Sequence, residues 1–411
     1  MKITSVKGTL DYLPKETALR DYLQNTILDT YRSCGFERIT TPILEDIENL
    51  DKSEGGENLN LIFKVMKRGE KFTEAIANGK FNELSDIGLR YDLTLPLSRY
   101  YACNKDKLST PFKVIQVDRV FRAERPQKGR LREFVQCDID ILGSESINCE
   151  IELIDTTAKA LLRVGIDNFK VKINDRRILR GIITGAGFEE SECDSVCITF
   201  DKLDKVGIEG VKAELEEKGF KQEAIDKFIE FVSVKEFNLE NASKFVEDKE
   251  AVNNLATIIS TVKSLTNGKY DIVYDPSLVR GQGYYTGTVF EVESLDFHGA
   301  IAGGGRYDNL IGKFLGQKVP AVGFSIGFER IAGILLEKGA SNQASPKRIA
   351  LIYNQNEVLE AIKKADELRK EYYVTLFEMP KKLGKFYGKL EEQNYYGCLI
   401  LGEGNEMKIF G

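Results

Sequence analysis

The feature that most constrains the fold is a pair of strand-like segments joined by a short basic connection. Residues 112–124 and 132–143 are rich in β-branched and aromatic residues, and the second alternates polar with apolar positions. The connection between them, RPQKGRL, is polar, contains glycine and carries several cations. Two such strands pair as a hairpin, so the sequence predicts an antiparallel sheet with a cationic loop at one end.

Helical and strand-like patterns alternate along the rest of the chain. Apolar residues at helical spacing predict a helix over 16–34, which Gly35 ends, and another over 149–166. Residues 36–46 read as one extended strand, with Pro42 limiting it to an edge or an end. Further expectations are a mostly strand-like stretch over 278–292, a glycine-rich turn leading to a helix over 299–312, and an apolar segment that becomes a helix over 321–339.

The chain divides into segments of different character. Residues 176–261 are charged and helical with no strand signal, which indicates an insertion between the sheet-forming parts 1–175 and 262–339. Residues 340–347, ASNQASPK, read as a linker. Residues 348–411 read as strand, helix, strand, helix and strand, which predicts a small α/β unit.

Composition excludes several classes of protein. The 411 residues contain no apolar run long enough to span a membrane and no signal-peptide pattern at the start. Seven cysteines, an odd number in a long chain, argue against a disulfide framework and favour a reduced, cytoplasmic protein. The one histidine, His298, argues against zinc sites and against Ser-His or Cys-His catalysis. The net charge of −6 argues against a surface coated with basic residues, and no Walker A pattern is present.

Three arginines lie among apolar or small residues, where an unpaired guanidinium is costly. Arg122 ends the first hairpin strand, Arg280 lies in the strand-like stretch beside glycines, and Arg330 heads a helix. One such arginine alone predicts a structural ion pair or a solvent-facing hairpin residue. Three together with the basic loop favour a bound polyphosphate, which a guanidinium fork binds bidentately. The loop cations are Arg125, Lys128, Arg130 and Arg132, and the glycines that would let backbone approach a ligand are Gly281, Gly283 and Gly303–Gly305.

Acidic and amide side chains accompany these cations. Glu124 lies two positions from Arg122, and Gln136, Asp138 and Asp140 share one face of the next strand. A carboxylate there could hold a substrate ammonium or a Mg²⁺ that rides on phosphates. The alternative is a salt-bridged, solvated sheet face.

These segments resemble the class II aminoacyl-tRNA synthetases, and specifically the histidyl-tRNA synthetase family. FERITTPILED is similar to motif 1 of that class, VFRAERPQKGRLREFVQCDIDILG to motif 2, and AVGFSIGFERI to motif 3. LVRGQGYYTGTVFE and GGGRYD resemble two signatures of the histidine enzymes, and KGTLDYLP resembles their N-terminal segment. The resemblance runs through residues 7–331 in the family's order, and the C-terminal unit resembles the family's anticodon-binding domain.

The resemblance implies an α+β protein with an antiparallel-sheet catalytic domain, a helical insertion and an anticodon-binding domain. It implies a cytoplasmic protein that acts in protein biosynthesis and forms a homodimer through motif 1. Its activity would be ATP-dependent ligation, in which L-histidine is activated to histidyl-adenylate and passed to tRNA(His), with Mg²⁺ accompanying ATP. Catalysis would rest on positioning and on stabilisation of negative charge rather than on a side-chain nucleophile.

The resemblance also implies roles for individual residues. Arg122 would hold the α-phosphate and Arg330 the γ-phosphate, while Arg280 would reach the substrate carboxylate and the α-phosphate. Arg122 and Arg280 would thus be the catalytic residues. Phe134 would stack on adenine and Glu124 would meet its amino group. The ATP-binding set would be Arg122, Glu124, Arg130, Phe134 and Arg330, and the histidine-binding set Asp92, Thr94, Gln136, Asp140, Arg280, Tyr284, Tyr285 and Tyr307.

Three departures from the family pattern stand out. Gly283 occupies the place of the family's acid in R-G-L-D-Y-Y, and Asp140 stands where many members have glutamate. The C-terminal unit is short and ends at EMKIFG, which weakens the expectation of anticodon contacts more than that of activation. Two alternatives stay open: a catalytically inactive, synthetase-like regulatory subunit of ATP phosphoribosyltransferase, and a paralogue that passes an activated amino acid to something other than tRNA.

Overall fold

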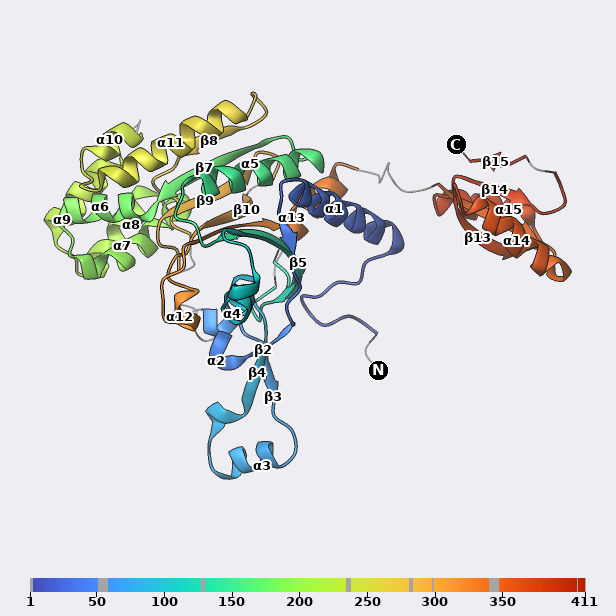
Figure 1. The fold of residues 1–411 in the computed structure, drawn as a ribbon, viewed down its shortest axis with the longest axis horizontal. Coiled ribbons are helices and arrows are strands. Elements are labelled where there is room, and N and C mark those ends of the chain that lie inside the picture. Colours follow the sequence, from blue (N-terminus) through green and yellow to red (C-terminus); the bar gives the residue numbers. More distant parts are fainter. Residues whose placement is uncertain are drawn as a thin grey trace. The chain divides into compact units, whose positions relative to one another are not determined.

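The computed structural model describes residues 3–50, 58–126, 130–233, 238–280, 284–297, 299–339, 347–404 and 406–410. It contains two compact units, Met1–Ala340 and Ser341–Gly411 (Figure 1). The predicted linker lies almost wholly outside the described residues, as do Gly281, Gly283, Lys128 and His298.

The first unit is built on an eight-stranded sheet in the order β1-β5-β6-β11-β10-β9-β7-β8. The central strands pair antiparallel, whereas both edge pairs, β1 with β5 and β7 with β8, are parallel. The hairpin predicted from the sequence pairs Phe112 with Leu142 and Phe121 with Glu133. The strands are β1 (Glu37–Arg38), β5 (Phe112–Phe121), β6 (Glu133–Leu142), β7 (Phe169–Asp175), β8 (Asp271–Tyr274), β9 (Thr288–Ser294), β10 (Gly299–Arg306) and β11 (Ala321–Gly327).

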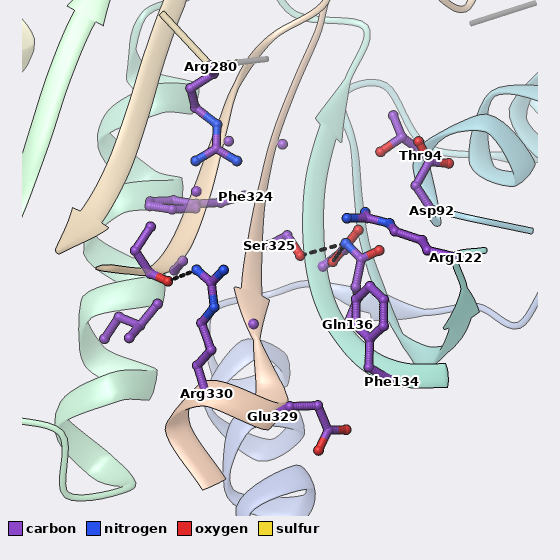
Figure 2. A pocket seen from close by; sticks show the side chains of 18 of the residues that line it. Asp92, Thr94, Arg122, Phe134, Gln136, Arg280, Phe324, Ser325, Glu329 and Arg330 are labelled. Atoms are coloured by element: carbon purple, nitrogen blue, oxygen red, sulfur yellow. Dashed lines mark hydrogen bonds between the residues drawn. The ribbon is translucent and has the colours of Figure 1, made fainter. Parts of the chain in front are cut away.

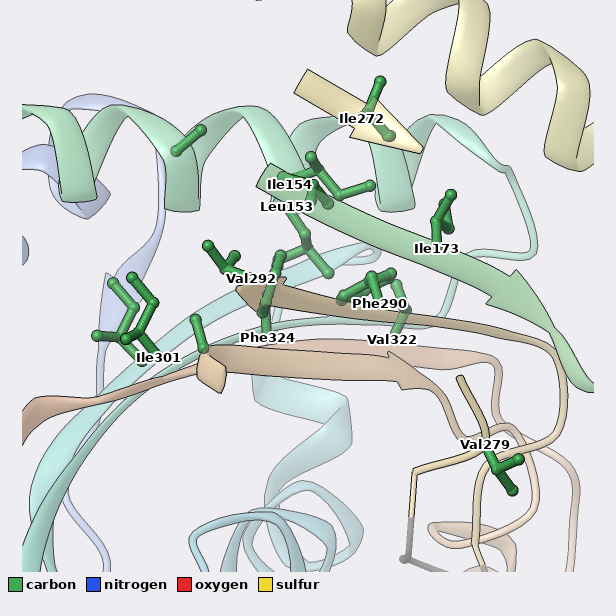
Figure 3. Close-up of a cluster of buried hydrophobic side chains, with 14 of the residues drawn as sticks. Leu153, Ile154, Ile173, Ile272, Val279, Phe290, Val292, Ile301, Val322 and Phe324 are labelled. Carbon is green, nitrogen blue, oxygen red and sulfur yellow. The ribbon is translucent and has the colours of Figure 1, made fainter. Parts of the chain in front are cut away.

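Helices cover one face of this sheet. α1 (Pro14–Ser33) buries Leu19, Leu23 and Ile27 at four-residue spacing, the apolar stripe of an amphipathic helix. α5 (Asn148–Arg163) and α13 (Phe328–Glu337) lie on the same face. In Figure 3, side chains of α5 meet those of β9 and β11 in this core. The mixed α+β architecture expected from the sequence is confirmed at this level.

A smaller sheet and several short helices lie on the other side of the main sheet (Figure 1). The order of this sheet is β2-β4-β3, from β2 (Leu44–Asp46), β4 (Ser85–Leu89) and β3 (Lys64–Met66). α4 (Thr94–Asn104) packs with neighbouring short helices around a second buried cluster. The short elements here are α2 (Ile47–Leu50), η1 (Asn58–Leu61), α3 (Glu70–Ala77), η2 (Phe81–Glu83), η3 (Lys105–Lys107) and α12 (Gly312–Leu315).

The chain between β7 and β8 is helical. Its elements are α6 (Arg176–Ala186), η4 (Glu190–Glu192), α7 (Cys193–Phe200), α8 (Leu203–Glu217), α9 (Gln222–Val232), α10 (Leu239–Ser243) and α11 (Lys249–Leu265). The edge strand β8 pairs in parallel with β7, which requires a long crossover, and these helices provide it.

The second unit is a four-stranded sheet with two longer helices. Its order is β13-β12-β14-β15, in which β15 alone is antiparallel to its neighbour. The sequence pattern did not identify β15, which has only two residues. The elements are β12 (Arg348–Tyr353), η5 (Gln355–Glu357), α14 (Val358–Leu368), β13 (Tyr373–Glu378), α15 (Leu383–Glu392), β14 (Gly397–Ile400) and β15 (Lys408–Ile409).

Residues 36–46 do not form one strand, so that prediction was wrong. They form β1 in the main sheet and β2 in the small sheet, with Pro42 between them. Proline has no N–H to donate to a ladder. The carbonyls of Thr41 and Pro42 instead accept hydrogen bonds, at 2.7 and 3.4 Å, from the fully buried guanidinium of Arg90. The chain therefore leaves the main sheet at this point.

Two further local predictions were wrong. Arg280 does not lie in a strand, because its φ of 59° is left-handed and β9 begins only at Thr288. Residues 299–306 are not a glycine-rich turn but the strand β10. Close packing explains the composition of β10, because a Cβ on Gly304 would lie 1.9 Å from the carbonyl oxygen of Gly323 on β11.

Within the described residues, no helix is long and apolar enough to cross a membrane.

Candidate active site

The sheet face opposite the helices carries a pocket, and strand alternation creates it. On β6, Val135, Cys137, Ile139 and Ile141 enter the helix-covered core. The residues between them, Gln136, Asp138 and Asp140, line the pocket. β11 follows the same rule, since Val322 and Ile326 are core residues whereas Gly323, Ser325 and Gly327 line the pocket. Phe324 belongs to the core and also reaches the pocket.

The structure places every predicted site residue at this pocket. They come from several distant segments: the turn before α4, the β5–β6 hairpin, the stretch before β9, the end of β10 and the start of α13 (Figure 2). These lining residues are Asp92, Thr94, Arg122, Glu124, Arg130, Phe134, Gln136, Asp140, Arg280, Tyr284, Tyr285, Tyr307 and Arg330.

One end of the pocket is acidic. Asp92, Asp138 and Asp140 are all nearly inaccessible to solvent. Burial raises the pKa of Asp92 to about 6, against the opposing effects of a backbone hydrogen bond and of Arg122. Burial also raises the pKa of Asp140 to about 7, although Tyr307 donates to it at 2.6 Å. The pKa of Asp138 lies well above its usual value, first through burial and then through Asp140. Such carboxyls become more acidic when a cation binds among them.

Polar atoms at this end remain available to a ligand. Oδ2 of Asp92 and Oε1 of Gln136 are buried and have no hydrogen-bond partner among the described residues. Gln136 donates from Nε2 to the hydroxyl of Ser325 at 3.0 Å, which fixes its side chain and turns Oε1 into the pocket (Figure 2). Buried acceptors without partners are costly, so these two atoms indicate a donor supplied by a ligand.

The pocket also contains arginines, and Arg122 lies next to Asp92 (Figure 2). Arg122 donates from Nε to the carbonyl of Tyr91 at 3.0 Å and lies over the ring of Phe134 at 5.1 Å. Arg330 donates to the carbonyl of Ala300. Neither Arg122 nor Arg330 forms an ion pair within the described part of the chain. Burial, followed by the positive charge of Arg130, lowers the pKa of Arg330. A cluster of unneutralised guanidinium groups favours an anion.

Arg280 differs from these arginines because it already has a carboxylate partner. Its Nη1 lies 3.1 Å from Oε2 of Glu291 on β9. Its guanidinium lies over Gly303, where a Cβ would come within 1.7 Å of Nη1. The sequence predicted that the glycines of β10 admit a ligand; Gly303 lines the pocket and also admits this side chain.

The ion pair between Glu329 and Arg20 supports the backbone next to Arg330 and Phe134. Glu329 accepts from Arg20 of α1 at 2.6 and 2.8 Å and from the backbone N–H of Val135 at 3.2 Å. Glu329 thus links α1 and β6 to the start of α13, which carries Arg330. Sequence reasoning did not assign roles to the lining residues Ser325 and Glu329. Asp138 was expected on the polar face of β6 as a possible ligand for an ammonium or Mg²⁺, but the resemblance gave it no specific role.

The described part of the basic loop has two functions. Arg130 pairs with Glu124 at 3.4 Å at the pocket. Arg132 instead donates to the backbone carbonyls of Glu124 and Lys7, at 3.1 and 3.4 Å, and so fastens the N-terminal segment. Arg132 therefore serves the structure, whereas Arg130 lines the pocket.

Residues 8–331 match the protein family described as Histidyl-tRNA synthetase. The chain belongs to the histidyl-tRNA synthetase family. It is 40% identical over 368 residues to the histidine–tRNA ligase of Leifsonia xyli subsp. xyli (strain CTCB07), a match that covers 86% of this chain and 84% of the relative.

Solved structures agree with this family. The chain is similar to the crystal structure of histidyl-tRNA synthetase from Nostoc sp. PCC 7120, with a TM-score of 0.81 and 30% identity over 98% of this chain and 92% of that one. It also shares its fold with an ATP phosphoribosyltransferase regulatory subunit/histidyl-tRNA synthetase from Bacillus halodurans C. There the TM-score is 0.79 and the identity 20%, over 97% and 98% of the two chains. At that identity the second likeness concerns the fold alone.

Proposed function

We propose that this chain is a histidine–tRNA ligase whose pocket activates L-histidine with ATP. The observation that carries this proposal is the presence of two opposite kinds of group in one pocket. Asp92, Asp138 and Asp140 supply buried carboxyls, whereas Arg122, Arg130 and Arg330 supply guanidinium groups, and Arg122 lies next to Asp92 where the two sets meet. An amino acid with its ammonium among the carboxyls and a triphosphate among the arginines fits this arrangement.

The arginines of the pocket bind ATP, which enters with Mg²⁺. Arg122 holds the α-phosphate and Arg330 the γ-phosphate, each with a guanidinium that has no ion-pair partner among the described residues. Phe134 offers its ring to adenine, with Glu124 and Arg130 at its edge. Within the described residues, no cluster of three or more acidic, histidine or cysteine side chains could hold a metal. The Mg²⁺ is therefore held mainly by the phosphates.

The acidic end binds histidine. Asp92 and Asp140 receive the ammonium and imidazole hydrogens, and Gln136 adds the free oxygen described above. Thr94 lies beside Asp92 at the start of α4. Three tyrosines enclose the ligand: the ring of Tyr284 lies 4.9 Å from that of Tyr285 and 5.9 Å from that of Tyr307.

The chemistry follows from this placement. An oxygen of the histidine carboxylate attacks the α-phosphorus, the bond to the β-phosphate oxygen breaks, and pyrophosphate leaves. Arg122 and Arg280 stabilise the negative charge that develops around that phosphorus. A ribose hydroxyl of tRNA(His) then takes the histidyl group and AMP leaves. No side-chain nucleophile takes part, because catalysis rests on positioning and electrostatics.

The tRNA contacts and the assembly extend this proposal. The second unit resembles an anticodon-binding domain, and we assign it that role. The chain forms a homodimer through its motif 1 region. Exposed apolar side chains in the small sheet, Leu44 at 52% and Met66 at 47% exposed, support an interface there.

Aminoacylation tests the proposed function directly. Labelled L-histidine, ATP, Mg²⁺ and tRNA(His) are expected to give a base-labile histidyl ester on the tRNA, and EDTA is expected to abolish its formation. Activation of histidine without any charged tRNA would favour the paralogue that serves another acceptor. A folded protein that binds histidine but neither activates nor transfers it would favour the regulatory-subunit alternative.

The pocket carboxyls also predict proton release on binding. The pKa of Asp92 is about 6 and that of Asp140 about 7, so both are partly protonated near pH 6.5 in the empty pocket. A bound ammonium stabilises their charged forms, and protons leave. As the pH falls below about 6, the neutral carboxyls bind histidine more weakly.

Calorimetric titration with histidine near pH 6.5, in two buffers of different ionisation enthalpy, measures this release. Asp140→Asn is expected to release fewer protons than the wild type. The imidazole of free histidine titrates in the same range, so both proteins are titrated at the same pH and histidine concentration. Equal release by the two proteins would contradict the assignment of Asp140.

A further inference from the structure

We propose that Glu291 is a positioning residue that holds the guanidinium of Arg280 in the orientation needed for activation. This inference rests on the proposed function and adds a residue that does not line the pocket itself. It begins from the conformation of Arg280, whose φ is 59°. A non-glycine residue in this region is strained and persists only where its surroundings fix it.

The surroundings of Arg280 are built by two neighbouring strands. Glu291 on β9 and Gly303 on β10 are directly paired in the sheet. The guanidinium lies over this pair: Gly303 leaves the space, and Glu291 supplies the carboxylate at 3.1 Å from Nη1. These two strands thus leave space for one guanidinium and place one carboxylate acceptor beside it.

The hydrogen bonds of Arg280 are used asymmetrically. Nη1 is engaged by Glu291, whereas Nε is buried and has no partner among the described residues. A guanidinium held at one corner presents its remaining N–H groups in a fixed direction. Since Arg280 lines the pocket, those groups are the ones that can meet the reacting carboxylate and phosphate.

Glu291 is available for this role because its cross-strand cationic neighbour pairs with other carboxylates. Lys172 on β7 is the cross-strand partner of Glu291 on the other side. Its ammonium pairs with Asp275 at 3.1 Å and with Glu293 at 3.4 Å. Burial raises the pKa of Glu291, and Arg280 is the largest influence opposing that rise. Position 283, where the family has an acid, is glycine here, and Glu291 is a carboxylate that pairs with Arg280.

Glu293 provides a matched control. It lies two residues further along β9, on the same face, and its carboxylate pairs with Lys170 at 2.8 Å and with Lys172. It does not line the pocket and has no ion pair with Arg280 among the described residues. Glu291→Gln and Glu293→Gln therefore remove the same charge from the same strand, but only the first removes the ion pair of Arg280.

The test is a double-mutant cycle in histidine-dependent ATP–pyrophosphate exchange. Glu291→Gln is expected to lower kcat about 10- to 100-fold, the usual effect of losing one charged hydrogen bond, with little change in the KM for ATP or in the melting temperature. Glu293→Gln is expected to stay within about twofold of the wild type. In an Arg280→Ala background, Glu291→Gln is expected to have almost no further effect, because its influence passes through Arg280.

Each outcome decides the inference. An unchanged kcat in Glu291→Gln would overturn it, and so would a loss of the same size with and without Arg280, since that would indicate a purely structural role. A wild-type protein with no exchange at all would contradict the proposed function and with it this inference. If the wild type shows exchange and Glu291→Gln has the same kcat, the inference alone would be contradicted and the proposed function would stand.

Discussion

Replacing Arg280 with alanine is expected to reduce histidine-dependent ATP–pyrophosphate exchange by about 10²- to 10³-fold, the usual effect of removing one preorganised donor from a developing anion. The side chain is held in a left-handed backbone conformation, over Gly303 and against Glu291, with its remaining N–H groups at the pocket. Because it acts on charge that develops at the α-phosphate, kcat should fall more than the KM for ATP rises. Steady-state exchange over a range of both substrates measures the two effects.

Arg180 offers a control for this experiment. It lies in α6, away from the pocket, and also carries an ion pair, at 3.1 Å to Glu190. Arg180→Ala removes a comparable charge and should leave exchange within about twofold of the wild type. If Arg280→Ala retained exchange at the level of Arg180→Ala, the role assigned to Arg280 would be wrong.

Replacing Arg306 with alanine is expected to destabilise the first unit by about 3–5 kcal/mol, the usual cost of leaving a buried charge without its partner. Arg306 donates to both carboxylate oxygens of Glu150, at 2.7 Å each, and Glu150 is only 1% exposed. The pair joins the end of β10 to the start of α5. Arg306 is followed in the sequence by Tyr307, whose hydroxyl donates to Asp140 in the pocket. Urea unfolding, followed by a probe in the first unit, measures the change in free energy.

The matched variant for Arg306 replaces both partners. In Arg306→Met/Glu150→Met the two charges are removed together, so no unpaired charge remains buried and part of the lost stability should return. A loss below about 1 kcal/mol in Arg306→Ala would show that Glu150 finds solvent or another partner, contrary to the structure. A double variant as unstable as Arg306→Ala would show that packing rather than charge is responsible.

Local pattern was sufficient to predict the part of the site that lies on regular strands. The alternation of Gln136, Asp138 and Asp140 on β6 predicted a polar face, and the structure places all three at the pocket. The strand spacing fixes that face through the geometry of the backbone itself. The hairpin of β5 and β6 was predictable for the same reason.

The parts that failed depend on contacts between distant segments. Pro42 limits a strand, but nothing in the local sequence shows that the buried side chain of Arg90 donates hydrogen bonds to the carbonyls of Thr41 and Pro42. The stretch around Arg280 has strand composition, but Arg280 has a left-handed backbone, and its guanidinium lies against Gly303 and Glu291, which distant segments supply. The glycines of β10 suggest a turn in isolation, but they are required where neighbouring backbone and side chains approach closely.

The most direct test of the account is amino-acid-dependent exchange of labelled pyrophosphate into ATP by the wild-type chain. The acidic end formed by Asp92 and Asp140, enclosed by tyrosines, predicts exchange with L-histidine and none above background with the other standard amino acids. Exchange with another amino acid would contradict the assigned histidine site. No exchange with any amino acid, from a folded protein supplied with Mg²⁺ and ATP, would contradict the assignment of the pocket as an activation site.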